Sequence, residues 1–430
     1  MRSPRSIRAV GAIAAAALVF VAAAAGYSPK SGDVARAALP NEVSKWNEIA
    51  QNTVLAQAPN ASAPPAAFVF MAMVQGSVYG AVNAIDREHR PYLVMERADP
   101  DASKEAAVAT AAFRVLDTVF PAQHAALQAA YDGSLGAIPD GPMKDAGIAV
   151  GAEAATAMLA EGHDGRSGPI PPLPPQGPGF WEPLLTGGGV PILDPSPWVA
   201  LAEPFLVKSS SQFRTDGPYA LTSDEYAADF NEVKALGDVD SAVRTAEQTH
   251  IAIFWQSNPA ATWNSVARRL AGEQELDITE SAVLFGLLNL SAADASINCW
   301  NDKYHYGFWR PIAAIREADT DGNPATEPDP TWAPFFLPPY PDHPSGANCF
   351  GASSLSALKA YFGDETPFYV TSAQFPGEQR PFERFSDAIS EIIEARIWGG
   401  LHFRNADVQG ATLGKQVVRY AKLHYFQPMN

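Results

Sequence analysis

Three short motifs in the last third of this 430-residue chain constrain its fold more than any other feature. In chain order they are Lys303-x6-Arg310-Pro311, Pro344-Ser345-Gly346 and Arg396-x5-His402. Together they supply three positive charges, a hydroxyl, turn amides and an imidazole. This set suits a tetrahedral or trigonal-bipyramidal oxyanion that is bonded to the histidine. Only a fold that gathers all three segments can use it, so we expect one anion pocket.

Lys303 and Arg310 form the first pair of cations. They lie seven residues apart in what we predict to be one helix, so both should face the same side. Pro311 should disturb that helix just beyond them. Taken alone, such a basic pair is usually a solvated surface feature. The surrounding aromatic residues argue against simple exposure, and they are Trp300, Tyr304, Tyr306, Phe308 and Trp309.

The other two motifs each have a local reason to face an anion. Ser345 and Gly346 are predicted to begin a helix, where free amides and the helix dipole favour negative charge. A plain N-cap role for Ser345 is compatible with this interpretation. The glycine pair 399–400 lets the backbone turn between Arg396 and His402, so that both side chains can face one site.

In order and spacing, the motifs resemble the signature of the vanadium-dependent haloperoxidase and type 2 phosphatidic-acid phosphatase superfamily, K-x6-R-P, P-S-G-H and S-R-x5-H-x3-D. The chain departs from this signature at three places. Ala347 replaces the histidine, Ala395 replaces the serine, and Asp407 lies one position later than the aspartate. Weaker similarity to bacterial members covers Trp300 and the segments 223–234 and 81–86.

The resemblance implies an enzyme that oxidises a halide or an organic substrate with hydrogen peroxide at a bound vanadate. The implied vanadate site consists of Lys303, Arg310, Ser345, Gly346, Arg396 and His402, with vanadium bonded to His402. Trp300 and Tyr340 would line the substrate side, or would be plain core aromatics. Two alternatives remain open. One is a secreted phosphatase that needs no cofactor and acts on a phosphate ester, with His402 as nucleophile. The other is an anion-binding homologue whose activity is impaired by Ala347.

The missing histidine matters because general acid–base assistance is worth about 10²–10⁴ in rate. His343 and His305 lie near the pocket motifs in the sequence and could replace it. The simpler interpretation is that both only make hydrogen bonds to nearby backbone.

Helical periodicity dominates the rest of the chain, and we predict an all-α fold. Apolar residues recur at three- and four-residue spacing in 68–85, 105–135, 144–162, 240–256, 262–276 and 279–303. The resemblance implies helical bundles with the active site in the C-terminal one. We divide the chain into a signal peptide at 1–37, an N-terminal helical region at 38–162, a crossover at 163–221 and a C-terminal helical domain at 222–430.

The crossover is rich in proline and glycine, so it cannot be a regular helix. We expect Phe180, Trp181 and Trp198 to anchor it on the surface of the helices. A disordered linker is the alternative, which this aromatic content disfavours.

The N-terminus is typical of an export signal, because three arginines precede an apolar run at 9–25. An uncleaved membrane anchor is the alternative. We expect a secreted or periplasmic protein whose mature chain has no stable membrane span. The net charge of −17 makes nucleic acid a poor partner. An anion pocket in such an acidic chain must also concentrate its cations locally.

Cys299 and Cys349 each lie four residues from a pocket residue, and export would permit a disulfide between them. Two buried small residues are the alternative interpretation, because cysteine is often buried. Both alternatives remain open at this point, since the geometry of a disulfide cannot be read from the sequence.

Overall fold

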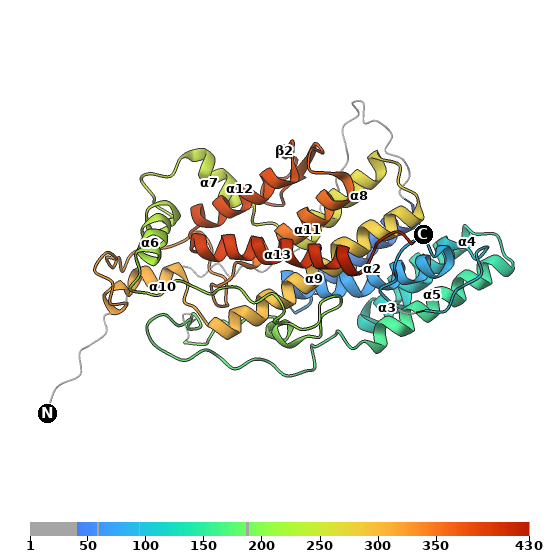
Figure 1. Cartoon of the computed structure of the whole chain (residues 1–430), viewed down its shortest axis with the longest axis horizontal. Coiled ribbons are helices and arrows are strands. Elements are labelled where there is room, and N and C mark those ends of the chain that lie inside the picture. Colours follow the sequence, from blue (N-terminus) through green and yellow to red (C-terminus); the bar gives the residue numbers. More distant parts are fainter. Residues whose placement is uncertain (1–40, 58–59, 94, 186–188, 430) are drawn as a thin grey trace.

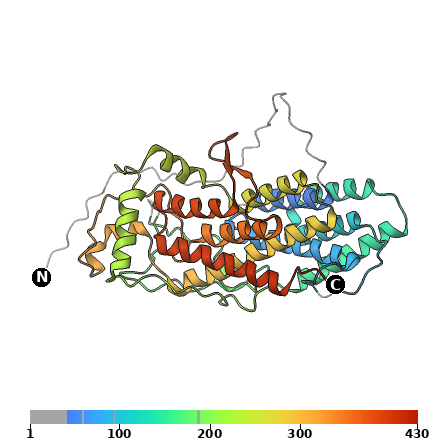
Figure 2. The ribbon, with the colours of Figure 1, turned by 45° about the horizontal axis from the view of Figure 1, so that its top comes forward.

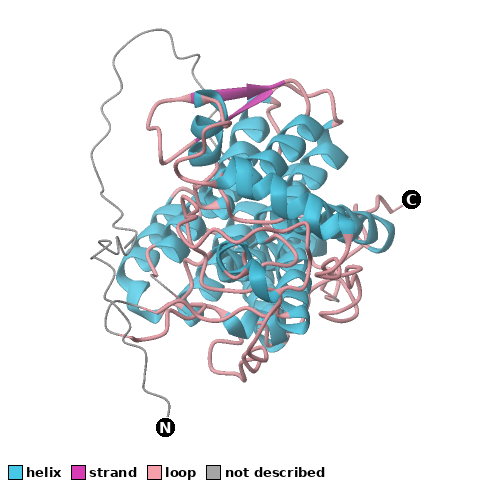
Figure 3. Cartoon of the chain, turned by 90° about the vertical axis from the view of Figure 1, so that its left-hand side faces the viewer, coloured by secondary structure: helices cyan, strands magenta, loops and turns pink. Residues whose placement is uncertain are grey.

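A computed structural model describes residues 41–57, 60–93, 95–185 and 189–429, and the expected signal peptide lies outside them. The described residues are mostly α-helical, which confirms the predicted all-α fold (Figure 3). The exception is a small antiparallel sheet of β1 (Phe368–Thr371) and β2 (Gln379–Phe382), in which Phe368 lies opposite Phe382.

The first half of the described chain consists of α1 (Glu42–Leu55), α2 (Pro64–Asp86), α3 (Lys104–Val119), α4 (His124–Gly136) and α5 (Pro142–Ala160). The sequence suggested one helix over 105–135, and this prediction is wrong. Phe120 leaves the helical conformation, and Pro121 begins a short 3₁₀ turn because it has no N–H to continue an α-helix. Helices α3 and α4 are therefore separate.

The second half consists of α6 (Asp224–Gly237), α7 (Ala246–Phe254), α8 (Pro259–Glu273), α9 (Ile278–Tyr306), α10 (Pro311–Arg316), α11 (Gly346–Phe362), α12 (Phe385–Trp398) and α13 (Arg404–His424). Side-chain caps explain several starts, since Ser223, Thr245 and Asp277 each accept a hydrogen bond from a backbone N–H in the first turn. Helix α9 is central and packs against α2, α11 and α13 (Figures 1 and 2).

Helices α2 and α9 are long and apolar enough to cross a membrane by length and composition. All residues of their apolar windows are buried inside the protein, however. A helix that is apolar on all sides is also what the centre of a large helical core requires.

The proline-rich crossover is folded onto the helices and includes the 3₁₀ segment η2 (Pro197–Leu201), and Figure 1 draws it in green. The Asp294 carboxylate on α9 accepts the backbone N–H groups of residues 205–207 at 2.6–2.9 Å. Trp181 and Trp198 are buried, as expected, whereas Phe180 is 37% exposed. The Trp181 N–H donates to the Gly307 carbonyl at 2.8 Å, which fixes the crossover beside the pocket motifs.

The prediction that Lys303 and Arg310 share one helix is wrong. Helix α9 ends at Tyr306, and Gly307 takes the left-handed conformation with φ +57°. Arg310 is extended and precedes α10, whose first residue is Pro311. The two cations therefore approach the same region from either side of a bend.

Candidate active site

Two buried cations hold one loop in place at the bend between α9 and α10. Lys303 Nζ donates to the carbonyls of Pro341 and Asp342 at 2.9 and 3.0 Å. Arg310 Nε donates to the Tyr340 carbonyl at 2.9 Å, and its Nη1 donates to the Leu401 carbonyl at 2.8 Å. Burial lowers the pKa of Lys303 to about 8.

His402 lies directly beside Arg310, with Nη1 3.2 Å from its Nε2. A guanidinium can only donate hydrogen bonds, so Nε2 accepts and the ring proton belongs on Nδ1. Burial lowers the pKa of His402 well below its usual value, and the charge of Arg310 and Lys303 adds to this effect. His402 is therefore a neutral imidazole whose Nε2 carries a lone pair.

Asp342 faces the other ring nitrogen of His402. Its Oδ1 lies 2.8 Å from His402 Nδ1 and 3.8 Å from Arg310 Nη1. The approach to Nδ1 is too oblique for a well-formed hydrogen bond, and neither carboxylate oxygen makes one with another described side chain. Burial raises the pKa of Asp342 to about 7, although Arg310 and Lys303 lower it. The only sign of Asp342 in the sequence is a carboxylate in the loop before Ser345, which did not single it out as a site residue.

The turn at 399–400 positions His402 as the sequence predicts. Helix α12 ends at Trp398, and Gly400 has φ +72°. A Cβ at Gly400 would lie 2.5 Å from the Gly237 carbonyl oxygen, so both the conformation and the space require glycine.

Ser345 begins α11, but its side chain makes no capping hydrogen bond. Ser345 therefore occupies the N-cap position without capping the helix through its side chain. Its Oγ instead accepts a hydrogen bond from Asn348 Nδ2 at 3.3 Å. A Cβ on the neighbouring Gly346 would lie 2.9 Å from the Trp300 ring, so the helix start packs directly on this tryptophan.

We expect Gly346→Ala to destabilise the fold by about 1–3 kcal/mol, because overpacking a rigid ring has that cost. Gly351→Ala is a matched control in the same helix, since its added Cβ would meet Ile392 Cδ1 at 3.4 Å and Trp263 Nε1 at 3.9 Å, which are ordinary contact distances. That control should gain up to about 1 kcal/mol from helix propensity. Urea unfolding of both variants measures the difference, and equal shifts would contradict the close packing at Gly346.

Arg396 and Asp407 complete the buried charges of the site. Arg396 Nη1 donates to Gln256 at 3.3 Å, while its Nε has no hydrogen-bond partner among the described residues. Asp407 Oδ1 accepts from Asn348 Nδ2 at 2.8 Å, and its Oδ2 has no hydrogen-bond partner in the part of the chain that the structure describes. Although Asp407 is one position later than in the signature, it lies in the site.

Trp300 and Tyr340 pack against each other beside Lys303. Their ring centroids are 5.1 Å apart, and Lys303 Nζ lies 5.5 Å and 5.2 Å from the two centroids. The Trp300 N–H donates to Asp194 at 2.8 Å. The two rings therefore form an aromatic wall next to a cation, whether or not they contact substrate.

The two histidines near the motifs have separate surroundings. His343 is buried, lies 3.1 Å from Thr215 Oγ1, and has its pKa lowered to about 3 by burial and then by Lys303. His305 is exposed at the end of α9. Position 347, where the signature has a histidine, is an alanine and has no ionisable group.

Cys299 and Cys349 are both buried free thiols, so the disulfide alternative is not formed. Burial raises the pKa of Cys349, and a hydrogen bond with Cys299 raises it further, so the two thiols adjoin each other. Cys299 also contacts the carbonyl of Pro344, directly before Ser345.

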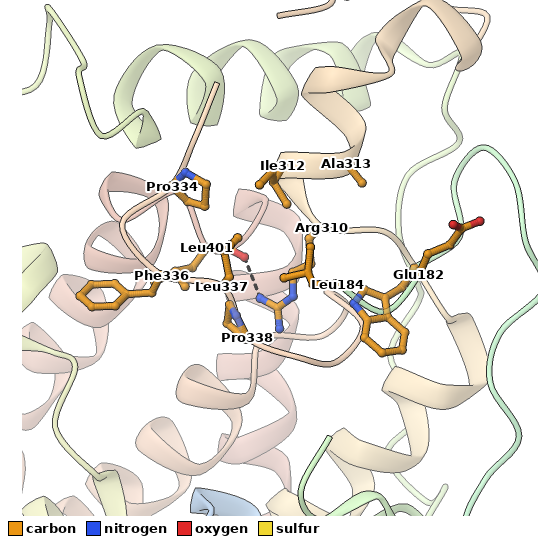
Figure 4. Close-up of a pocket in the computed structure, with 12 residues that line it drawn as sticks. Glu182, Leu184, Arg310, Ile312, Ala313, Pro334, Phe336, Leu337, Pro338 and Leu401 are labelled. Atoms are coloured by element: carbon orange, nitrogen blue, oxygen red, sulfur yellow. Dashed lines mark hydrogen bonds between the residues drawn. The ribbon is translucent and has the colours of Figure 1, made fainter. Parts of the chain in front are cut away.

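A narrow apolar cavity of about 30 Å³ is open to the surface and is lined in part by Arg310. Figure 4 shows the guanidinium bonded to the Leu401 carbonyl, with the side chains of the cavity around it. The walls come from α10, the loop before Pro341 and the crossover, and include Ile312, Phe336, Leu337, Trp181 and Leu184. Arg310 is thus reached from outside through an apolar entrance.

Residues 283–430 match the family described as the VCPO second helical-bundle domain. Over 200 residues, the chain is 28% identical to the vanadium chloroperoxidase of Curvularia inaequalis. That match covers 37% of this chain and 32% of the relative, so the chain spans about a third of the length of this curated protein.

Solved structures with the same fold cover nearly the whole chain. A bacterial vanadium-dependent iodoperoxidase superposes with a TM-score of 0.74 at 19% identity, over 90% of this chain and 97% of that one. A holo-type bacterial vanadium-dependent chloroperoxidase gives 0.66 at 18% identity, over 90% and 97%. At these identities the likeness establishes the helical fold.

Proposed function

We propose that this chain, which belongs to the vanadium haloperoxidase and type 2 phosphatidic-acid phosphatase superfamily, is an exported peroxidase that uses bound vanadate. Its substrates would be hydrogen peroxide and a halide or a small organic molecule. The observation that carries this proposal is the neutral His402, whose Nε2 lone pair lies among three buried cations.

The residues fit an oxyanion bonded to one histidine. Lys303, Arg310 and Arg396 bring three positive charges, against the carboxyl groups of Asp342 and Asp407. Arg396 Nε is buried without a hydrogen-bond partner among the described residues, which is costly unless an anion accepts a hydrogen bond from it. Within the described ranges no three His, Cys, Asp or Glu side chains cluster as a metal site. A vanadate bonded to one imidazole nitrogen needs no such cluster.

In this proposal each residue has a defined task. Lys303, Arg310, Arg396, Ser345 and the amide of Gly346 would hold the oxygens, and His402 Nε2 would hold vanadium. Bound vanadate supplies the activation of peroxide. The carboxyl group of Asp342, 2.8 Å from His402 Nδ1, would favour the proton on that nitrogen, so that the Nε2 lone pair can bond vanadium. The apolar entrance at Arg310 limits the access of bulk water.

The test is a titration of the metal-free protein with vanadate, with bromide oxidation by hydrogen peroxide as one readout and hydrolysis of an aryl phosphate as the other. We expect vanadate to switch on oxidation and to suppress any phosphate release. Phosphate release that vanadate only inhibits would instead make the chain a phosphatase, with His402 as nucleophile. Tight binding without either reaction would indicate an impaired anion-binding protein.

A further inference from the structure

The buried cluster around Ser345 contains more polar groups than oxyanion binding requires. Asn348 Nδ2 donates to both Ser345 Oγ and Asp407 Oδ1, at 3.3 and 2.8 Å. Asn348 Oδ1 and Asp407 Oδ2 have no hydrogen-bond partner among the described residues, and both residues are almost fully buried. Such groups are rare in a core, so they call for an explanation in the chemistry of the site.

We propose that Asp407 is a proton donor of this pocket, acting through the hydroxyl of Ser345 in place of the histidine that is absent at position 347. The inference rests on the proposed function, since it assigns a role to a residue of the same site. Asp407 belongs to α13, whereas Asn348 belongs to α11 and Ser345 directly precedes it, so the cluster exists only because these two helices pack together.

The charges around Asp407 allow it to hold and release a proton. Burial raises the pKa of Asp407 well above its ordinary value, and the charge of Asp342 acts in the same direction. Ser345, Arg396 and Asn348 lower the pKa, and they would stabilise the carboxylate once the proton has left. The charge of Arg310 also interacts with that of Asp407, so both Arg310 and Arg396 would stabilise the carboxylate. A carboxyl group whose pKa is raised holds its proton more readily than an exposed one, which is the property that a general acid needs.

The proton would move in two linked transfers. The carboxyl proton of Asp407 passes to Ser345 Oγ as the hydroxyl proton of Ser345 passes to an oxygen of the bound anion. Asp407 ends as a carboxylate next to Arg396, and Ser345 ends as a hydroxyl again. Asn348 positions both oxygens through its two donated hydrogen bonds. Asp407 is therefore a positioning and proton-supplying residue that acts through Ser345.

The first experiment measures proton uptake when inorganic phosphate binds. Calorimetry in two buffers with different ionisation enthalpies gives the protons taken up per phosphate, for the full chain and for Asp407→Asn. The titration of phosphate itself is common to both proteins, so it cancels in their difference. We expect the unmodified protein to take up more protons than Asp407→Asn. Asp229→Asn is the control, because Asp229 also has a raised pKa but is only partly buried and accepts a hydrogen bond from the Asn405 N–H.

The second experiment separates a proton donor from a structural residue. We expect Asp407→Asn to lower vanadate-dependent bromide oxidation by about 10²-fold or more and to flatten its pH profile. Adding Ala347→His to this variant should restore much of the rate, since it places a histidine at the signature position. Ser345→Ala should show the same loss and the same rescue, which keeps the test decisive if Asp407→Asn does not fold.

The outcomes distinguish this inference from the proposed function. If phosphate and vanadate bind and oxidation proceeds, but Asp407→Asn matches the unmodified protein in proton uptake and pH profile, the inference is wrong. If vanadate gives no oxidation at all while proton uptake depends on Asp407, the proton donor stands and the peroxidase proposal fails. A failure of Ala347→His to rescue either variant would also overturn the inference.

Discussion

His402→Ala is expected to abolish vanadate-dependent bromide oxidation, with a loss on the order of 10³-fold or more. The reason is that His402 Nε2 is the atom proposed to bond vanadium, and no other imidazole takes its place beside Arg310. The affinity for vanadate should fall towards the affinity for phosphate, because Lys303, Arg310 and Arg396 still attract either anion. Phosphate binding should change little. Calorimetric titrations with both anions, beside the oxidation assay, measure these effects.

His305→Ala is the control for this prediction, because His305 is exposed at the end of α9 and should leave both readouts unchanged. A His402→Ala protein that still oxidised bromide at the original rate would remove His402 from the reaction. If both histidine variants lost activity equally, the effect would lie in the folding of the region and not in the bond to vanadium.

The parts of the fold that follow local rules could be predicted from the sequence. Helix α6 begins after Ser223, whose hydroxyl accepts from the Tyr226 N–H, and α11 ends at Gly363, and both residue types are common at such positions. The helix break at Pro121 was missed because the apolar spacing continues across it, whereas the missing N–H of proline decides the backbone.

The site could be predicted only as far as its motifs reached. The structure brings together the five motif side chains of Lys303, Arg310, Ser345, Arg396 and His402. The single helix predicted to join Lys303 and Arg310 is not formed, because the left-handed Gly307 ends α9 and Pro311 begins α10. The pairing of Asp342 with His402 was invisible, because it joins segments far apart in the sequence through a loop that Lys303 and Arg310 hold in place. Such a contact depends on tertiary packing, for which the sequence carries no periodic signal.

Asp342→Asn is expected to lower oxidation by about 10²-fold while leaving phosphate binding equal or tighter. The amide nearly preserves the size of the side chain but removes one negative charge from a pocket that must bind an anion, so affinity should not fall. An amide can also donate to His402 Nδ1, which would favour the tautomer with the proton on Nε2 and block the bond to vanadium. Calorimetry with phosphate and steady-state oxidation kinetics separate the two effects.

This split between binding and rate is what distinguishes a residue that orients His402 from one that merely supports the fold. A structural loss would weaken phosphate binding and oxidation together, and it would lower the unfolding midpoint in urea. Asp229→Asn provides the comparison, since it removes a carboxylate outside the His402 contact. If Asp342→Asn kept its full oxidation rate, the proton on Nδ1 would have to be fixed by Arg310 alone, whose guanidinium lies 3.2 Å from Nε2.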